Sequence, residues 1–343
     1  MISQVKKQMA TLREEIEKKK LKQKVGGGLT YYVPKAGAAQ VAIVGLTNSG
    51  RSSLLRTVTN AQVEVTPYPF GTNIPVPGML PYEDIQIQLV EVPPIVEGSS
   101  EGRADGFMRL GLARNADGII LVVDVSRDPL DDFLTVAREL ANSRILIAEP
   151  EGEVEIQRRG GTGIQFVWEG ELDGCSQEEV LALLDGYKIR SALVRVRGRV
   201  GLEAVEDAIF GNAVYRPTLV VANKIDLPHG ADVMKQLRMA TEPLEVVETS
   251  TTDWNLVDVL GRKLFTLLGI ARIYTKEPGK EPAKTPFVVR SGVTVGELAR
   301  MIHNDFYDNF RYARLWGTSA RFPAEKVGLD RRLEDRTVIQ LYT

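Results

Sequence analysis

The sequence is poor in cysteine and has no long apolar run. Its 343 residues include one cysteine, Cys175, which excludes a disulfide framework and fits a reducing compartment. The longest apolar run, residues 118–123, is far too short to span a bilayer and is typical of a buried strand. The lysine-rich start of the chain has no apolar stretch behind it, so no signal peptide is predicted. We therefore expect a cytoplasmic protein with no membrane partner.

Neither sign of charge is in large excess. The chain has 43 Lys and Arg against 45 Asp and Glu, a formal net charge of −2. The whole molecule thus offers no argument for nucleic-acid binding, which would have to come from local patches. The hydrophobic content of 43% and the charged content of 26% are ordinary for a globular protein. The length suffices for a full α/β core and one or two smaller domains.

The N-terminus has the pattern of a basic helix. Apolar residues recur there at alternating three- and four-residue spacing: Ile2, Val5, Met9, Leu12 and Ile16. This spacing predicts a helix with the seam of a two-stranded coiled coil. Lysines crowd the same segment, which ends at the glycines of positions 26–28. Two interpretations stay open: a solvated helix on its own domain, or an arm that contacts RNA or a partner.

Residues 40–125 alternate apolar strands with helical segments. We predict strands at 41–44, 85–92, 118–124 and 217–222, and helices at 52–59 and 256–268. The strand 85–92 alternates in polarity like an edge strand. Helices between strands indicate a mostly parallel sheet with right-handed crossovers. The fold class is therefore α/β.

The remaining segments predict smaller units. Between 124 and 218 we expect short strands and helices, enough for an inserted α+β subdomain. Residues 276–286 resemble an extended linker, followed by a β-α-β region. The predicted divisions are an N-terminal basic helix and linker at 1–36, the main domain at 37–143 and 213–275, the insertion at 144–212, and a linker with a C-terminal domain at 276–343.

A phosphate-binding loop is predicted where the first strand ends. Gly45 to Ser52 has the spacing GxxxxGK[ST] and opens a helix, so its N–H groups would cradle phosphates while Ser52 binds Mg²⁺. Arg51 replaces the lysine, and a planar guanidinium is no equivalent of a compact ammonium. Alone, the segment is also compatible with a simple glycine turn. The candidate ligands are Asn48, Ser49, Gly50, Arg51, Ser52 and Ser53.

The tetrapeptide Asn223-Lys224-Ile225-Asp226 follows a predicted strand and indicates the base. The Asp226 carboxylate can accept both N1–H and N2–H of guanine, a pairing that adenine cannot make. The stem of Lys224 would cover one face of the base. Together with the phosphate loop, the tetrapeptide predicts GTP and GDP as ligands.

The positions expected around the γ-phosphate depart from the usual pattern of a G domain. Thr72 lies where the first switch supplies a threonine to Mg²⁺ and the γ-phosphate. Glu91 and Pro94 stand where such a domain has Asp-x-x-Gly. Glu91 is one methylene too long, and Pro94 has no N–H to donate. Ile95 follows in place of a glutamine that would position water. These catalytic positions predict slow or impaired hydrolysis.

Almost end to end, the sequence resembles the developmentally regulated GTP-binding (DRG) proteins of the Obg-HflX group, which are translation-associated GTPases. The segments that carry the resemblance are Tyr68 to Thr72, Val76 to Gly78, Ile95 to Gly98, Tyr187 to Ile189, Val214 to Pro217, Trp254 to Asn255 and Arg272 to Lys276. Ile302 to His303, Tyr312 to Gly317, Leu333 to Asp335 and Val338 to Gln340 resemble a TGS domain, a ubiquitin-like β-grasp module.

The resemblance implies further roles. It makes the insertion similar to ribosomal protein S5, and the N-terminal helix one half of a helical hairpin. Family roles carry over to Ser52, Thr72, Asn223, Lys224 and Asp226. Thr249 and Ser250 would form a weaker base-contacting loop. Arg51, Glu91 and Pro94 depart from the family's Lys, Asp and Gly.

Two classes of function follow from these residues. In one, the protein is a slow, ribosome-associated GTPase whose switches report the nucleotide to a regulatory partner. In the other, it is a nucleotide-binding or nucleotide-free scaffold that has lost hydrolysis. Asn48 matches an asparagine that helps some related G proteins bind K⁺, although asparagine also stabilises turns.

The C-terminal domain offers a second surface for RNA. Its cations and aromatics are interleaved: Arg311, Arg314 and Arg321 beside Tyr312, Trp316 and Phe322. Phosphate contacts and stacking on exposed bases would suit this mixture. The alternative is that Tyr312 and Trp316 belong to the core of the β-grasp module.

Overall fold

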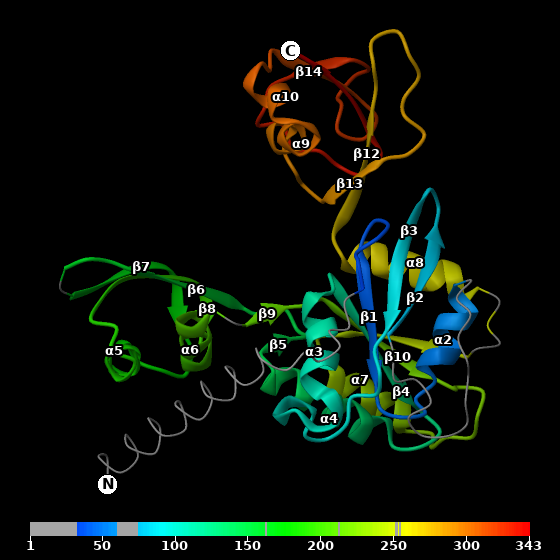
Figure 1. Cartoon of the computed structure of the whole chain (residues 1–343), viewed down its shortest axis with the longest axis vertical. Coiled ribbons are helices and arrows are strands. Elements are labelled where there is room, and N and C mark those ends of the chain that lie inside the picture. Colours follow the sequence, from blue (N-terminus) through cyan, green and yellow to red (C-terminus); the bar gives the residue numbers. More distant parts are fainter. Residues whose placement is uncertain (1–32, 60–74, 162, 212, 251–252, 254) are drawn as a thin grey trace. The chain divides into compact units, whose positions relative to one another are not determined.

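The structure is a computed structural model that describes residues 33–343 except 60–74, 162, 212, 251–252 and 254 (Figure 1). The N-terminal basic helix and Thr72 lie outside the described residues. No helix of the described part is long and apolar enough to cross a membrane.

A six-stranded sheet forms the centre of the main domain, in the order β11-β10-β4-β1-β3-β2. Its strands are β1 (Gln40–Gly45), β2 (Val76–Tyr82), β3 (Ile85–Glu91), β4 (Gly118–Asp124), β10 (Thr218–Asn223) and β11 (Glu245–Thr249). All neighbours pair in parallel except β2, which is antiparallel to β3. The predicted α/β fold with a mostly parallel sheet is confirmed.

The prediction of β3 as an edge strand was wrong. It lies between β1 and β2, and six of its seven residues are buried. The edge strand on this side of the sheet is β2, which contains Pro77 and Pro81. Proline cannot donate to a ladder, so it disguises a strand in the sequence and suits an edge.

Helices cover both faces of this sheet. They are α2 (Arg51–Val58), α3 (Gly106–Asn115), α4 (Pro129–Asn142), α7 (Val233–Thr241) and α8 (Leu256–Leu267). The strands β1, β4 and β10 are buried throughout, as expected for a parallel sheet with helices on both faces. One core gathers apolar side chains of α3, α4 and α7, and the other those of α2 and α8. The sheet therefore positions the loops at its ends.

The insertion is an α+β unit, as predicted. Two short strands, β5 (Ile145–Leu146) and β9 (Val214–Tyr215), pair in parallel at its base. The strands β6 (Gly152–Arg158), β7 (Gly163–Leu172) and β8 (Ser191–Val200) form a sheet in the order β6-β8-β7. The helices α5 (Gln177–Gly186) and α6 (Leu202–Phe210) supply apolar side chains to its core.

The C-terminal domain has a five-stranded sheet in the order β13-β12-β16-β14-β15. Its elements are β12 (Ile270–Thr275), β13 (Phe287–Arg290), α9 (Val295–Ile302), α10 (Asn304–Asp308), β14 (Tyr312–Trp316), β15 (Glu325–Val327) and β16 (Thr337–Tyr342). The sequence placed β12 with the main domain, whereas in the structure it pairs with β13 and β16. The predicted linker 276–286 is thus a loop within this domain.

Candidate nucleotide site

Two loops meet where β1 and β10 end, at the carboxyl edge of the parallel sheet, which is where open α/β sheets bind ligands. The phosphate loop connects β1 to α2, and the base loop follows β10. Gly50 stands at φ 96°, and a Cβ there would lie 2.1 Å from the Nδ2 atom of Asn223. Only glycine allows the two loops to approach this closely.

Side chains of the base loop bind the phosphate loop directly. The Nδ2 atom of buried Asn223 donates to the carbonyl of Ser49 at 3.0 Å. The Nζ atom of Lys224 donates to the carbonyl of Asn48 at 2.9 Å. Asp226 is exposed at the following turn. The predicted base and phosphate ligands are therefore neighbours in space, although Asn223 follows Ser52 by 171 positions in the sequence.

The second base-contacting loop lies beside the first. Thr249, at the end of β11, is the register partner of Asn223, and its carbonyl accepts from the N–H of Ile225 at 3.3 Å. Ser250 follows and is buried. The structure brings these residues next to Asn223.

Asp124 at the end of β4 is a site residue that the sequence reasoning missed. Its Oδ2 atom accepts from Lys224 Nζ at 2.5 Å, and its Oδ1 atom accepts from the N–H and the hydroxyl of Ser126 at 3.0 and 2.6 Å. Burial raises the pKa of Asp124, but the bonds from Lys224 and Ser126 outweigh it and lower that pKa overall. The sequence did hold a signal for this residue, because Asp124 is a carboxylate at the end of a buried strand.

On the phosphate side, Arg51 points into the protein. Its side chain is 5% exposed, and Nη1 donates to the carbonyl of Val92. The Nε atom has no hydrogen-bond partner among the described residues. Burial is the main cause that lowers the pKa of Arg51, to about 10. The negative charge of Glu91 opposes this shift, and the positive charge of Arg109 adds to it. The guanidinium thus binds the protein's own backbone.

Glu91 and Ser52 meet at the end of β3. The hydroxyl of Ser52 donates to Oε1 of Glu91 at 2.6 Å, and the Glu91 side chain is fully buried. Burial raises the pKa of Glu91, while the bond from Ser52 and the charge of Arg51 oppose the rise. Oε2 of Glu91 and Oγ of Ser49 have no partner among the described residues. These buried polar atoms favour an additional ligand here.

Backbone atoms of the segment 91–95 are bonded at several points. Nη1 of Arg109 donates to the carbonyl of Pro94, just as Arg51 does to that of Val92. The N–H of Ile95 donates to the carbonyl of Gly45 at 3.2 Å. Two buried guanidinium groups and the phosphate loop therefore hold a segment that already contains two prolines.

Glu139 of α4 holds the residues that follow. Its two carboxylate oxygens accept from the N–H of Gly98 at 2.8 Å and of Ser100 at 2.6 Å. The sequence reasoning missed Glu139 and Arg109, because both bind backbone atoms of a distant segment and neither belongs to a local motif.

Comparison with known proteins decides the family. The profile of the 50S ribosome-binding GTPase family matches residues 40–149, that of its C-terminal region 161–270, and that of the TGS domain 271–343. Developmentally-regulated GTP-binding protein 2 of Homo sapiens is 33% identical over 315 residues, which cover 92% of this chain and 85% of the relative. The chain belongs to the developmentally regulated GTP-binding (DRG) protein family.

Other relatives agree with this assignment. An uncharacterized GTP-binding protein of Methanocaldococcus jannaschii is 36% identical over 99% of this chain and 86% of its own length. The YchF GTPase structure of Schizosaccharomyces pombe has a TM-score of 0.51 at 13% identity, covering 91% of this chain and 99% of that one. That likeness concerns the fold alone. The predicted family and TGS domain are confirmed, and this chain is a GTP-binding protein of the DRG family.

GTPases of this kind generally use Mg²⁺, and two oxygen donors of this DRG chain fit the ion. The Ser52 hydroxyl and the Glu91 carboxylate adjoin each other, and the unpartnered Oε2 supplies a further acceptor. Mg²⁺ prefers oxygen ligands and is usually held by one or two protein groups with waters and phosphates. No cluster of three or more His, Cys, Asp or Glu suited to a metal occurs among the described residues.

The remaining predicted site residues differ in how exposed they are. Ser53 lies half-buried in α2. Asn48 is exposed and stands at φ 64°, a left-handed conformation that asparagine tolerates in turns. Thr72 lies outside the described residues.

Proposed function

We propose that this DRG family member is a guanine-nucleotide switch of the Obg-HflX group with slow or impaired GTP hydrolysis, and that it acts on the ribosome in the cytoplasm. One observation carries the enzymatic part of the proposal: the buried Arg51 donates to the carbonyl of Val92.

The phosphate end of the site supplies less than a γ-phosphate needs. A phosphoryl transfer site requires a cation and N–H groups that face the charge of the transition state. Arg51 gives at least one of its N–H groups to Val92. Pro94 has no N–H, and its carbonyl is bonded to Arg109. The γ-phosphate therefore adds little binding affinity, and GTP should bind about as tightly as GDP.

The base and metal roles complete the proposed site. Asp226 pairs with guanine, and Lys224 covers its face beside Asn223. Ser52 binds Mg²⁺ together with the phosphates, aided by Thr72. Bound Mg²⁺ would neutralise phosphate charge, and the oxygen of Ser52 could bind it while the hydroxyl proton stays hydrogen-bonded to Glu91.

The open face of the TGS sheet supports an RNA partner. The rings of Tyr312 and Tyr342 stack with centroids 4.4 Å apart. Lys326 lies over Tyr312 at 4.3 Å, and Arg314 lies over Tyr342 at 5.6 Å. Lys276 lies over the ring of Trp316 at 5.1 Å. Ring faces and cations are thus combined in this domain, a combination that suits unstacked bases and phosphates.

Burial favours the surface interpretation of Tyr312 and Trp316 over the interpretation that they belong to the domain core. Both are only half-buried, and neither belongs to the apolar cluster of this domain. Phe322 is 60% exposed, and Arg311, Arg314 and Arg321 are exposed as well. These residues are accessible to a partner.

The insertion contrasts with this face. Its β8 arginines are each paired with carboxylates, Arg195 with Glu155, Arg197 with Glu169, and Arg199 with Asp173. Carboxylates on the flanking strands match the charges of Arg195 and Arg197, and a carboxylate just after β7 matches that of Arg199. Ribosome or RNA contact is therefore assigned to the TGS face and to the lysine-rich residues 1–24.

Two measurements test the proposal. In single-turnover assays with a large excess of protein, we expect GTP to be bound but hydrolysed slowly, and fast hydrolysis would contradict the impaired site. In co-sedimentation, the chain should associate with ribosomes at low salt and dissociate as salt rises, because phosphate contacts release counterions.

Matched variants locate the contact. Arg314→Gln with Lys326→Gln, or deletion of residues 1–24, should lower both the ribosome affinity and its salt dependence. Arg197→Gln, which removes a paired arginine of the insertion, should leave both unchanged. Failure of the parent chain to co-sediment at low salt, with or without guanine nucleotide, would favour a scaffold for another partner.

A further inference from the structure

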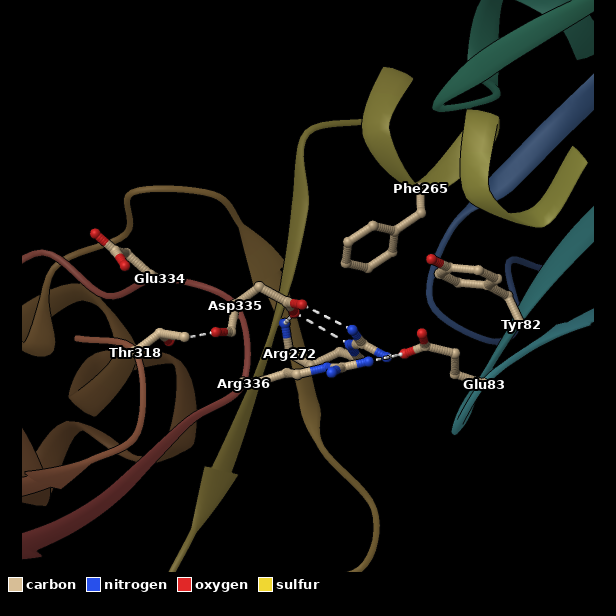
Figure 2. A pocket seen from close by; sticks show the side chains of 8 residues that line it. All are labelled: Tyr82, Glu83, Phe265, Arg272, Thr318, Glu334, Asp335 and Arg336. Carbon is tan, nitrogen blue, oxygen red and sulfur yellow. Dashed lines mark hydrogen bonds and ion pairs between the residues drawn. The ribbon is translucent and has the colours of Figure 1, made fainter. Parts of the chain in front are cut away.

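A buried arginine joins the TGS domain to the turn of the β2–β3 hairpin. Arg272 of β12 is 3% exposed, and its guanidinium lies between carboxylates from the two domains (Figure 2). Nε and Nη2 bind Asp335 of the TGS domain at 3.1 and 2.7 Å. Nη1 binds Asp84 at 2.9 Å, and also Glu83. We call these four residues the Arg272 latch.

Neighbouring side chains reinforce the latch. Nη2 of Arg336 donates to Glu83 at 2.7 Å, and the hydroxyl of Tyr274 donates to Asp84. The bonds from Arg272 and Arg336 lower the pKa of Glu83. Burial would raise the pKa of Asp84, but the bonds from Tyr274 and Arg272 lower it overall. Both carboxylates of the turn are therefore charged at neutral pH.

The hairpin tip also packs on α8. The ring of Tyr82 lies 5.4 Å from that of Phe265, and a Cβ on Gly261 would lie 2.8 Å from the Tyr82 ring. The Arg272 guanidinium lies over the ring of Phe265, 4.9 Å from its centroid. A pocket of about 420 Å³ adjoins the latch, lined by the residues drawn in Figure 2. The tip is thus held by few side chains beside open space.

The other end of the same hairpin is the nucleotide site. Glu91, the last residue of β3, pairs with Val76 of β2 and accepts the Ser52 hydroxyl. Glu91 is seven residue steps from Asp84 along the strand, roughly 23 Å at the usual rise per residue. Two hydrogen-bonded strands are stiffer than a loop. A displacement of Glu91 is therefore transmitted along the hairpin to its turn at Glu83 and Asp84.

We propose that the Arg272 latch couples the nucleotide site to the TGS domain through the β2–β3 hairpin. The coupling rests on the proposed function, in which bound Mg²⁺ would draw on the Ser52 oxygen and on the unpartnered Oε2 atom of Glu91. A shift of Glu91 toward the ion displaces the carboxyl end of β3, and the hairpin weakens the hold on Glu83 and Asp84. By linkage, an intact latch opposes nucleotide binding to the same extent.

The first test measures whether the latch holds the domain. With Cys175→Ser, spin labels at exposed positions 235 of α7 and 330 of the TGS domain report the distance between the domains. We expect a narrow distribution for the full chain and a broad one for Glu83→Gln with Asp84→Asn. Glu245→Gln, which breaks an exposed pair with Lys263 inside the main domain, is the control and should leave it narrow.

The second test measures coupling without nucleotide. Ser52→Ala removes the hydroxyl that holds Glu91, so it should broaden the distribution in the parent. It should add nothing when Glu83→Gln and Asp84→Asn are already present. An unchanged distribution in Ser52→Ala would overturn the proposal, even though the latch itself formed.

The third test uses GDP with Mg²⁺. The double variant of the turn should bind it about fivefold more tightly or better, the lower end of usual coupling factors, whereas Glu245→Gln should bind it like the parent. Equal affinities within error would overturn the coupling. If the parent binds no guanine nucleotide, the proposed function fails, and the Ser52→Ala comparison still decides whether site and latch are coupled.

Discussion

The base side and the phosphate side of the nucleotide site are built on the same sheet edge, but they differ in how their charged residues are used. Lys224 is bonded to Asp124 and to the carbonyl of Asn48, while Asp226 remains exposed for a ligand. On the phosphate side, Arg51 and Glu91 are buried and bonded to Val92 and Ser52. The base side leaves the Asp226 carboxylate free to bind guanine. On the phosphate side, the groups expected to bind the γ-phosphate are already bonded within the protein.

The difference teaches that base recognition and hydrolysis are separable properties. Recognition needs one exposed carboxylate on a braced loop. Hydrolysis needs several donors aimed at charge that develops during the reaction. Substitutions that affect only the second set leave a protein that still selects guanine. The following changes would break or sharpen this comparison, in order of decreasing effect.

The largest effect is expected for Asp226→Asn. The variant should lose about 1–3 kcal/mol of GDP binding, because the polar edge of guanine is left unpaired. It should gain xanthine nucleotide, whose edge suits an amide. Fluorescent GDP and XDP titrations measure both, with Asp232→Asn as an exposed control in the same region. Equal affinity of the parent for ATP and GTP would refute base reading by Asp226.

A smaller effect is expected when the phosphate side is restored. Arg51→Lys with Pro94→Gly supplies a compact cation and an N–H, so GTP affinity should rise more than GDP affinity. We expect the preference for GTP to increase about tenfold, equivalent to about 1.4 kcal/mol. Arg56→Lys, on the exposed side of α2, controls for the exchange of cations. A parent chain that already prefers GTP tenfold would refute the impaired site.

The smallest effect concerns K⁺. The φ of 64° at Asn48 already accounts for asparagine in the phosphate loop. We therefore expect the same nucleotide affinity and turnover in potassium and sodium buffers. Faster turnover in potassium that disappears in Asn48→Ala would instead assign this side chain as a ligand of the ion.

Local motifs predicted much of the site. The tetrapeptide at Asn223 and the loop at Gly50 carry their own spacing, and the structure places them in contact. Arg109 and Glu139 could not be found this way, because each binds backbone atoms that lie 15 or 41 positions away. Their role depends on how helices α3 and α4 pack, which no local pattern encodes.

The fold shows the same division. Apolar strands such as β4 and β10 were evident from composition, whereas β2 was concealed by its prolines. The strand β12 is assigned to the main domain by the linker-like composition of residues 276–286, which follow it. Its membership of the TGS sheet depends on pairing with β16, more than sixty residues later. Long-range pairing of this kind leaves no local trace.

The pairing of β5 with β9 brings together the two points where the inserted unit begins and ends. Ile145 and Val214 are register partners, and the N–H of Val214 donates to the carbonyl of Arg144 at 2.9 Å. The polypeptide therefore passes the same point twice, once before and once after the inserted unit. If the chain ran from Arg144 straight to Val214, the main domain would lose the inserted unit without losing a strand of its six-stranded sheet. The inserted unit is therefore a side branch of the main domain.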